Sequence, residues 1–375
     1  MLGDGWPLKD GCLRRNNALA SLLLAGYIGC GNLGDDAIML GFSNGIHRYG
    51  HECQVLSGRP EETNRLHGVP AVPRRDFKRI KEAIGESDAL VFPGGSIFQD
   101  VTSFRSVLYY SRLVKMAKKA GKKVFMVGQG VGPLKTIIGR SFARQAFQSA
   151  DLIAVRDSAS ATTLKELGVK HSPRITADCA FLLSAPHRAD DSLGFQVGEM
   201  KTVGIAARPL GKGHDVVGII SDFCRLLFQS GAMPILLAMD RNEDVPLIQQ
   251  IEDRAGGKIP DLRKLESPGD IQSRIARMDT IVAVRLHAGI LASTVGVPSL
   301  MLAYDPKVTA FARQLDIGPA VSMDKLTGAR LFDAYTAFQK DRDRNASIVT
   351  AKHEELAKAA AQNVELVASA FRART

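Results

Sequence analysis

Cationic side chains follow three predicted strands in the second half of the chain, and their chemistry suits an anionic ligand. The apolar runs at 203–207, 280–284 and 299–303 are followed by these residues: Arg208, Arg285 with His287, and Lys307. Because the carboxyl ends of parallel strands meet at one edge of a sheet, we expect these side chains to share a pocket. Arginine forks suit phosphate and carboxylate groups, and imidazole titrates near neutral pH. His287 is therefore the candidate catalytic residue, and the other seven histidines are interpreted as structural.

A glycine-rich turn follows the first predicted strand, in the segment GYIGCGNLGDDAIML at 26–40. Its glycines allow backbone amides to approach a ligand closely. The segment contains the spacing G-x-G-x-x-G, but Asp35 and Asp36 stand where a dinucleotide pyrophosphate would lie, so the match is weak. A tight turn capped by Asp35 is the alternative interpretation.

Two further glycine turns follow later strands, in FPGGSIFQD at 92–100 and GQGVGPL at 128–134. Gly94, Gly95 and Ser96 offer amide and hydroxyl donors at the edge of the sheet where open α/β folds bind ligands. Three glycine-bearing strand ends at one edge predict a binding cleft.

Arg156 ends another predicted strand, at 152–155. At that position its side chain would point toward the same cleft. An equally good interpretation is a structural ion pair with the adjacent Asp157.

Short apolar runs alternate with helix-length amphipathic segments along most of the chain, which is typical of parallel strands covered by helices on both faces. The polar stretch from 183 to 201 interrupts this alternation and predicts a domain boundary. We expect two Rossmann-like, doubly wound α/β domains, at 1–185 and 200–345. The Ala-rich segment 347–375 is expected to be a helix that packs back on the first domain.

Composition limits the class of protein. The 375 residues are 45% hydrophobic and 23% charged, as in a folded globular protein with a large core. Five scattered cysteines without a C-x-x-C pair favour reduced thiols in the cytoplasm, and neither a signal peptide nor a membrane span is expected. No P-loop, H-E-x-x-H motif or Cys/His cluster predicts a nucleotide or metal site.

The net charge of +10 comes from one segment, since residues 101–150 contain ten Lys and Arg and no Asp or Glu. Within it, five lysines gather at a predicted helix end: Lys115, Lys118, Lys119, Lys122 and Lys123. One interpretation is a solvated helix end whose cations favour the helix dipole. The other is a peripheral contact with anionic lipid headgroups at the inner face of the cell membrane. A nucleic-acid partner is not expected.

These segments together resemble the polysaccharide pyruvyltransferase family, most closely its bacterial cell-wall-glycan (CsaB-type) branch. The similar segments run in the family's order from about residue 22 to about residue 310: GYIGCGNLGDDAI, FPGGSIFQD, GQGVGPL, VRDSAS, ADCAF, ARP and VAVRLHAGILASTVGVPSLMLAYDPKV. The last segment is the most specific. Cys30 and Cys179 depart from the family's pattern, and Cys30 is expected to affect the fit of the acceptor.

The resemblance implies a fold similar to that of GT-B glycosyltransferases, with two domains facing a cleft. It implies phosphoenolpyruvate as donor and a pair of glycan hydroxyls as acceptor, with no cofactor or metal. The product would be a cyclic pyruvate ketal, typically at positions 4 and 6 of a hexosamine. In the cell-wall branch the acceptor is a lipid-diphosphate-linked glycan with N-acetylmannosamine, and the ketal provides an anchor for surface-layer proteins.

The resemblance also implies roles for individual residues. His287 would protonate the donor, Arg285 and Lys307 would hold its phosphate and carboxylate, and Arg208 and Arg156 would assist. The acceptor would contact the glycine turns through these residues: Gly29, Gly31, Asn32, Asp35, Asp36, Gly94, Gly95, Ser96 and Gln129. Asp35 or Asp36 would bind sugar hydroxyls or act as a base.

Three other functions stay open at this point. One is a GT-B glycosyltransferase that uses a nucleotide-sugar, although such an enzyme usually supplies a carboxylate for the ribose where this chain has cations. Another is a non-catalytic protein that binds anionic glycans or nucleic acid. The third is a pyruvyltransferase that acts on a nucleotide-linked or exopolysaccharide precursor. The sequence leaves the oligomeric state open.

Overall fold

The N-terminal part of the chain is built on an all-parallel sheet in a computed structural model that describes residues 19–100, 104–184, 200–211 and 213–371. The strand order is β3-β2-β1-β4-β6-β7-β8, with β5 beside β6. The strands are β1 (Ser21–Leu24), β2 (Glu52–Ser57), β3 (Ala71–Pro73), β4 (Ala89–Phe92), β5 (Gly95–Phe98), β6 (Lys123–Val131), β7 (Leu152–Val155) and β8 (Arg174–Ile175). The helices are α1 (Leu33–His47), α2 (Pro60–His67), α3 (Phe77–Glu86), α4 (Phe104–Lys119), α5 (Ile137–Ser149) and α6 (Ser158–Glu166), followed by the 3₁₀ turn η1 (Cys179–Leu182).

The C-terminal part has its own parallel sheet, in the order β11-β10-β9-β12-β13-β14. Its strands are β9 (Thr202–Ala206), β10 (Met233–Leu237), β11 (Asp261–Leu262), β12 (Thr280–Ala283), β13 (Ser299–Ala303) and β14 (Val321–Ser322). The helices are α7 (Val216–Gln229), α8 (Asp244–Ala255), α9 (Pro268–Ile275), α10 (Leu286–Ser293), α11 (Pro306–Leu315), α12 (Gly328–Lys340) and α13 (Arg342–Ser369). We refer to the two sheets with their helices as the N-terminal and C-terminal domains. The expected α/β architecture with two parallel sheets is confirmed.

Both sheets are covered on their two faces, which explains the continuous apolar strands. Every residue of β4 and of β12 is buried. Short polar side chains begin the helices between the strands: Asn32 accepts from the amides of Gly34 and Asp35, and Asp157 caps α6. The alternative interpretation with Asp35 as the cap is therefore wrong, because the cap of α1 is Asn32, three residues earlier.

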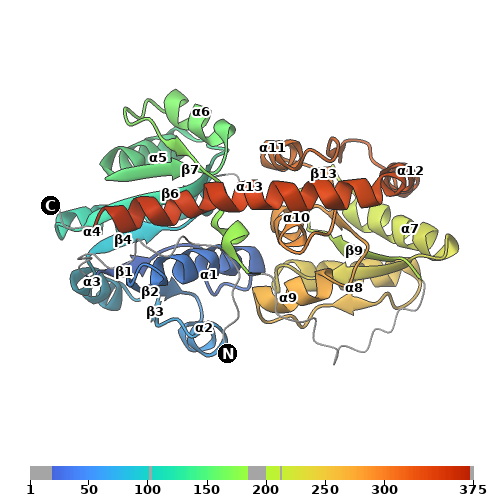
Figure 1. The fold of residues 1–375 in the computed structure, drawn as a ribbon, viewed down its shortest axis with the longest axis horizontal. Helices are drawn as coiled ribbons and strands as arrows, with labels where there is room; N and C mark the ends of the chain where they lie inside the picture. Colours follow the sequence, from blue (N-terminus) through green and yellow to red (C-terminus); the bar gives the residue numbers. More distant parts are fainter. Residues whose placement is uncertain (1–18, 101–103, 185–199, 212, 372–375) are drawn as a thin grey trace.

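The two domains are joined through backbone and core contacts. The loop before α1 pairs with the loop after β10, where the Leu33 amide donates to the Met239 carbonyl at 2.9 Å and the Arg241 amide donates to Gly31 at 2.8 Å. One apolar cluster continues from Phe42 in α1 through Ile281 in β12 to Val364 in α13. Helix α13 crosses in front of both domains (Figure 1) and packs on α1, η1 and α11. The expected domain boundary falls mainly on residues 185–199, outside the described chain.

Candidate functional site

His287 stands at the interface between the domains. It is the second residue of α10 in the C-terminal domain, and its imidazole Nε2 lies 3.6 Å from Asp178 Oδ2 of the N-terminal domain. Its ring packs directly on α1, since a Cβ added at Gly34 would lie 2.3 Å from His287 Nδ1. Only 17% of the side chain is exposed. The other domain therefore determines where this imidazole sits.

Hydrogen bonds to both carboxylate oxygens fix the Asp178 side chain beside the imidazole. Asp178 caps η1 through Oδ1, which accepts from the Ala180 amide at 3.0 Å, and Oδ2 accepts from Arg156 Nη1 at 2.8 Å. Burial alone would raise the pKa of Asp178, but contacts with His287 and Arg156 outweigh it and hold this pKa well below its ordinary value. Asp178 is thus a fixed carboxylate that faces the His287 ring. Sequence reasoning missed its role, although it lies within the segment ADCAF.

Arg156 connects Asp178 with the glycine turn after β4. Its Nη2 donates to Ser96 Oγ at 2.9 Å, and its Nε lies 3.6 Å from Asp157. The expected pair with Asp157 is present, but Asp178 is the closer partner. Arg156 is only 5% exposed, so its placement requires both carboxylates. Ser96 therefore orients this arginine in the described structure.

Asp35 faces the same group of charges from α1. Burial raises the pKa of Asp35 to about 6, the charge of Asp178 adds to the shift, and His287 and Arg156 oppose it. A Cβ added at Gly95 would lie 3.2 Å from Asp35 Oδ1, so the glycine turn leaves room for this carboxylate. A carboxyl group with a pKa near 6 is suited to exchanging protons near neutral pH.

Asp36 points the other way and holds the turn before α1. Its Oδ1 accepts from the Gly29 amide at 2.8 Å, and burial raises its pKa to about 7. With Gly29 and Gly31 it lines an interdomain pocket of about 430 Å³, whose wall includes Arg241. Gly29, Gly31 and Asp36 are thus brought together, on a different pocket from the one beside Asp178.

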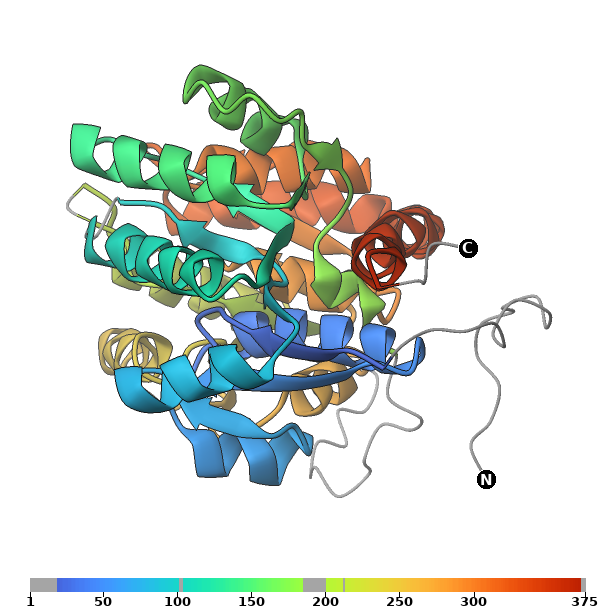
Figure 2. The same cartoon turned by 90° about the vertical axis from the view of Figure 1, so that its left-hand side faces the viewer.

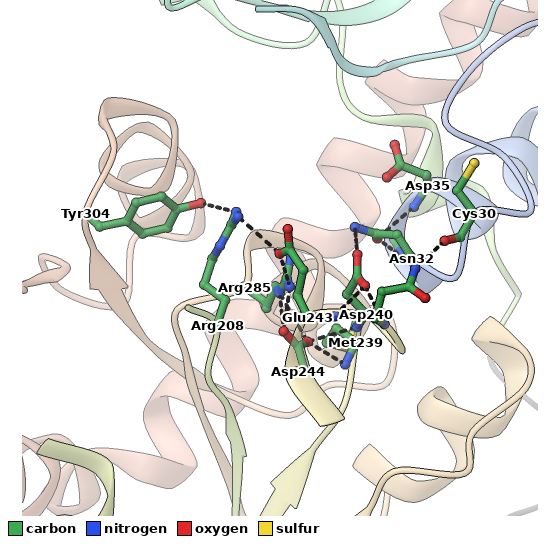
Figure 3. A network of polar contacts seen from close by, with 12 residues as sticks. Cys30, Asn32, Asp35, Arg208, Met239, Asp240, Glu243, Asp244, Arg285 and Tyr304 are labelled. Atoms are coloured by element: carbon green, nitrogen blue, oxygen red, sulfur yellow. Dashed lines mark hydrogen bonds and ion pairs between the residues drawn. The ribbon is translucent and has the colours of Figure 1, made fainter. Parts of the chain in front are cut away.

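Two of the cations predicted at strand ends of the C-terminal domain, Arg208 and Arg285, lie together with carboxylates between them (Figure 3), whereas His287 and Lys307 have other partners. Arg285 makes two-pronged contacts with Asp244, with Nη2–Oδ1 at 2.5 Å, and reaches Glu243 at 2.8 Å. Arg208 lies 3.4 Å from the same Glu243 and donates to the Tyr304 hydroxyl at 2.9 Å. Glu243 and Asp244 were missed because they lie at the start of α8 and do not directly follow a strand.

Lys307 has a different environment, because it lines a pocket between the domains. This pocket of about 280 Å³ is walled by both domains, with Arg156, Asp178 and Phe181 on one side and Lys307 and Gln314 on the other. Lys307 Nζ lies 3.8 Å from Asp305, and the side chain is 26% exposed. The pocket thus combines the cations of Lys307 and Arg156 with the carboxylates of Asp157 and Asp178.

Three predicted residues lie elsewhere. Gln129 is fully buried, and its Nε2 donates to the carbonyls of Phe92 and Val127, so it links strands instead of facing a ligand. Gly94 adopts a φ of 148° and passes close to Gly128 O, which makes it a packing position. Cys30 lies 2.9 Å from Arg74 Nη1, beside the turn before α1.

The model of a family described as polysaccharide pyruvyl transferase matches residues 32–306, which is most of the chain. The chain belongs to this family. It is a polysaccharide pyruvyltransferase, and the family implies a donor and a glycan acceptor. Membership decides against the nucleotide-sugar glycosyltransferase and the non-catalytic binding protein.

The pyruvyltransferase has a distant relative among characterised proteins. The amylovoran biosynthesis protein AmsJ of Erwinia amylovora is 22% identical over 372 aligned positions, which cover 81% of this chain and 88% of the relative. This similarity supports polysaccharide synthesis as its general role.

Solved structures support the GT-B-like fold. A putative UDP-N-acetylglucosamine 2-epimerase from Listeria monocytogenes superposes with a TM-score of 0.68 at 12% identity, covering 96% of this chain and 98% of that one. HepE from Anabaena, in complex with UDP-glucose, gives a TM-score of 0.61 at 13% identity over 94% of this chain and 100% of that one. At such identities the likeness concerns the fold alone.

No described helix combines the length and the apolar character needed to cross a bilayer. Within the described ranges, no group of three or more His, Cys, Asp or Glu side chains is arranged to hold a metal ion.

Proposed function

We propose that the pyruvyltransferase takes its pyruvyl group from phosphoenolpyruvate and forms a cyclic ketal on two hydroxyls of a glycan, releasing phosphate. The observation that carries this proposal is the position of His287. Its imidazole faces the ionised Asp178 across the domain interface, next to the pocket that Arg156 and Lys307 line. A proton donor beside an anion pocket is what addition to an enol phosphate requires.

The donor is assigned to the interdomain pocket. Phosphoenolpyruvate carries a phosphate and a carboxylate, and Lys307 and Arg156 supply cations from opposite domains. Arg208 is 26% exposed and is proposed to reach the donor from the rim. Arg285 is compensated by Asp244 and Glu243, so its contribution is to fix the beginning of α10, where His287 stands.

The chemistry follows from these positions. The His287 imidazolium protonates the methylene carbon of the donor, which leaves an oxocarbenium-like centre at the neighbouring carbon. The oxygen of the first sugar hydroxyl bonds to that carbon, and its proton passes to Asp35. The carbon–oxygen bond to phosphate then breaks, phosphate leaves with the electron pair, and the second hydroxyl closes the ring. The proton of one hydroxyl restores the proton that His287 gave to the methylene carbon. The proton of the other hydroxyl leaves with phosphate.

The acceptor is assigned to the glycine turns of the N-terminal domain. Asp35 and Gly95 lie together beside His287, and Ser96 is bonded to Arg156. Asn32 stands at the same loop, although its side chain is occupied by the cap of α1. These positions support an acceptor that approaches from the N-terminal domain, with the donor between the domains.

We propose a lipid-linked cell-wall precursor with N-acetylmannosamine as the acceptor, pyruvylated at positions 4 and 6, in the cytoplasm. The free thiols of the described cysteines are consistent with that compartment. The similarity to a protein named for amylovoran biosynthesis favours a second candidate, the precursor of another polysaccharide, with the same chemistry.

The test uses the purified chain with phosphoenolpyruvate and each of the two classes of acceptor. We expect phosphate release that depends on the acceptor, and a product heavier by one pyruvate less one water. His287→Ala should lower kcat by about 10³-fold, and Asp178→Asn by about 10²-fold, without loss of donor binding. His47→Ala, on the exposed end of α1, is the matched control.

Two outcomes contradict the proposal. If phosphoenolpyruvate neither binds nor supports turnover with any glycan acceptor, the donor assignment is wrong. If His287→Ala turns over at the wild-type rate, the proton comes from another group and the site has been misplaced.

A further inference from the structure

Large apolar side chains are exposed where α4 and α5 begin. The exposed fractions are 44% for Phe104, 40% for Leu108, 87% for Ile137 and 55% for Ile138. A single exposed apolar residue is ordinary on a protein surface, but several in one region mark an interaction site.

These side chains lie at the same end of two adjacent helices. Ser111 Oγ in α4 donates to the Phe142 carbonyl in α5 at 3.2 Å, so the two helices are neighbours. The loops before them are also tied together, since the buried Asp100 carboxylate accepts from the amides of Lys135 and Thr136 at 2.6 and 2.8 Å. Figure 2 shows α4 and α5 stacked side by side on the outside of the N-terminal domain.

Beyond the exposed apolar side chains, the same surface carries cations. On α4, Arg112, Lys115 and Lys119 are exposed, and with Leu108 they recur every three or four residues, which places them on one helix face. Lys135 and Arg144 are exposed on the neighbouring loop and on α5. No Asp or Glu occurs between residues 104 and 149, so every charge that α4 and α5 themselves contribute to this surface is positive.

The lysines at the other end of α4 are partly used within the molecule. Lys118 bonds to Asp151 at 2.8 Å, Lys122 donates to the Gly85 carbonyl at 2.8 Å, and Lys123 donates to Ala370 at 2.7 Å. These three contacts match the interpretation of a structural helix end. The candidate surface is therefore the outer face of α4 and the beginning of α5, not the lysine cluster.

We propose that this surface docks on a bilayer that contains anionic phospholipids. Isoleucine, leucine and phenylalanine enter the boundary between headgroups and acyl chains, while the cations are attracted to anionic headgroups. Helices α4 and α5 follow strands β5 and β6, and β5 begins with Gly95 and Ser96 beside the end of β6. Only this last point rests on the proposed function: the docked enzyme would present its acceptor side to a membrane-held glycan.

The experiment is flotation of the full chain with phosphatidylcholine vesicles, with and without phosphatidylglycerol. We expect binding only to the anionic vesicles, weakened by salt. Ile137→Ser with Ile138→Ser should reduce binding by about tenfold, as should Arg112→Gln with Lys115→Gln. Phe228→Ser, at an exposed apolar position on α7, is the matched control and should bind as the wild type does.

Activity on a water-soluble acceptor separates this proposal from the proposed function. The isoleucine variant should keep wild-type kcat on that acceptor and its thermal midpoint while losing vesicle binding. Wild-type chain that does not float with anionic vesicles, or an isoleucine variant that floats as well as wild type, would overturn the membrane proposal. Capture of phosphatidylcholine and anionic vesicles alike would also contradict it, because the cations would then have no role.

Discussion

Asp35 is the residue whose protonation state the proposed reaction depends on most directly. Its ordinary pKa of 3.8 is raised to about 6, because burial penalises the carboxylate more than His287 and Arg156 stabilise it. The folded state therefore holds a proton on Asp35 that the unfolded chain has lost between about pH 4 and pH 6. Stability from this proton is present below pH 4 and is lost as the pH rises through 6. Activity follows the opposite course, since the ionised form is the base.

We predict that kcat/KM falls as the pH drops below about 6, in a single titration, because a protonated Asp35 cannot accept the sugar proton. Asp35→Asn should lower kcat/KM by about 10²-fold at pH 7.5 or above. The measurement is the ratio of wild-type to Asp35→Asn kcat/KM across pH, which cancels titration of the donor phosphate. A ratio that stays constant between pH 5 and pH 8 would exclude Asp35 as the base.

Among the secondary-structure elements, the first turns of α1 and α10 pack so closely that only a glycine at position 34 leaves room for His287. Gly34 lies in the first turn of α1, and a Cβ there would meet Nδ1, Cγ and Cβ of His287 within 2.6 Å. Gly34 has no positive φ, so its role is space and not backbone conformation. The first turn of α1 thus fixes the position of the His287 imidazole relative to Asp178.

Gly34→Ala is predicted to lower kcat by at least about tenfold, because the imidazole must move away from Asp178 or the domains must separate. Circular dichroism should show an intact fold, since alanine favours helix. Gly85→Ala in α3 is the matched control: nothing lies within 4 Å of its added Cβ. That control should keep full activity and gain about 0.5–1 kcal/mol in free energy of unfolding. Wild-type kcat for Gly34→Ala would show that the contact does not position His287.

Considering the whole molecule, α13 brings a buried side-chain amide, that of Asn363, into the N-terminal domain. Asn363 Oδ1 accepts from the Gly128 amide at 3.1 Å and from Thr176 Oγ1 at 2.7 Å, and its Nδ2 donates to the Ala177 carbonyl at 2.8 Å. Asn363 thereby fixes the segment that leads into Asp178. Because α13 packs on both domains, the segment before Asp178 is held by a helix that also contacts the C-terminal domain.

We predict that Asn363→Leu lowers the free energy of unfolding by about 2–4 kcal/mol, because it leaves buried polar groups on β6 and before η1 without partners. Urea unfolding followed by circular dichroism measures the difference. Gln362→Leu, at the exposed neighbouring position, should change stability by no more than about 0.5 kcal/mol. Equal stability of the two variants would show that the amide network contributes nothing.

Much of the fold could be predicted because its signals are local. Buried parallel strands such as β4 and β12 are short apolar runs, and glycine turns mark their ends. The sequence did not predict four strands of two or three residues: β3, β8, β11 and β14. Such short runs cannot show a periodic pattern of apolar residues. The start of α1 was misplaced because Asn32 and Asp35 are both good caps, and only the backbone path selects between them.

The sequence by itself determined the α/β class, the family and the positions of His287, Lys307 and Arg156 at strand ends, because turn chemistry and strand order follow from neighbouring residues. Only the tertiary structure decided which charges meet. Asp178 faces His287, and Asp244 compensates Arg285, across distances in the chain that no local pattern spans. The pKa of Asp35 and the burial of Gln129 depend on the atoms that the other elements bring around them. Burial and distance set electrostatic energies, and both exist only once the two domains have come together.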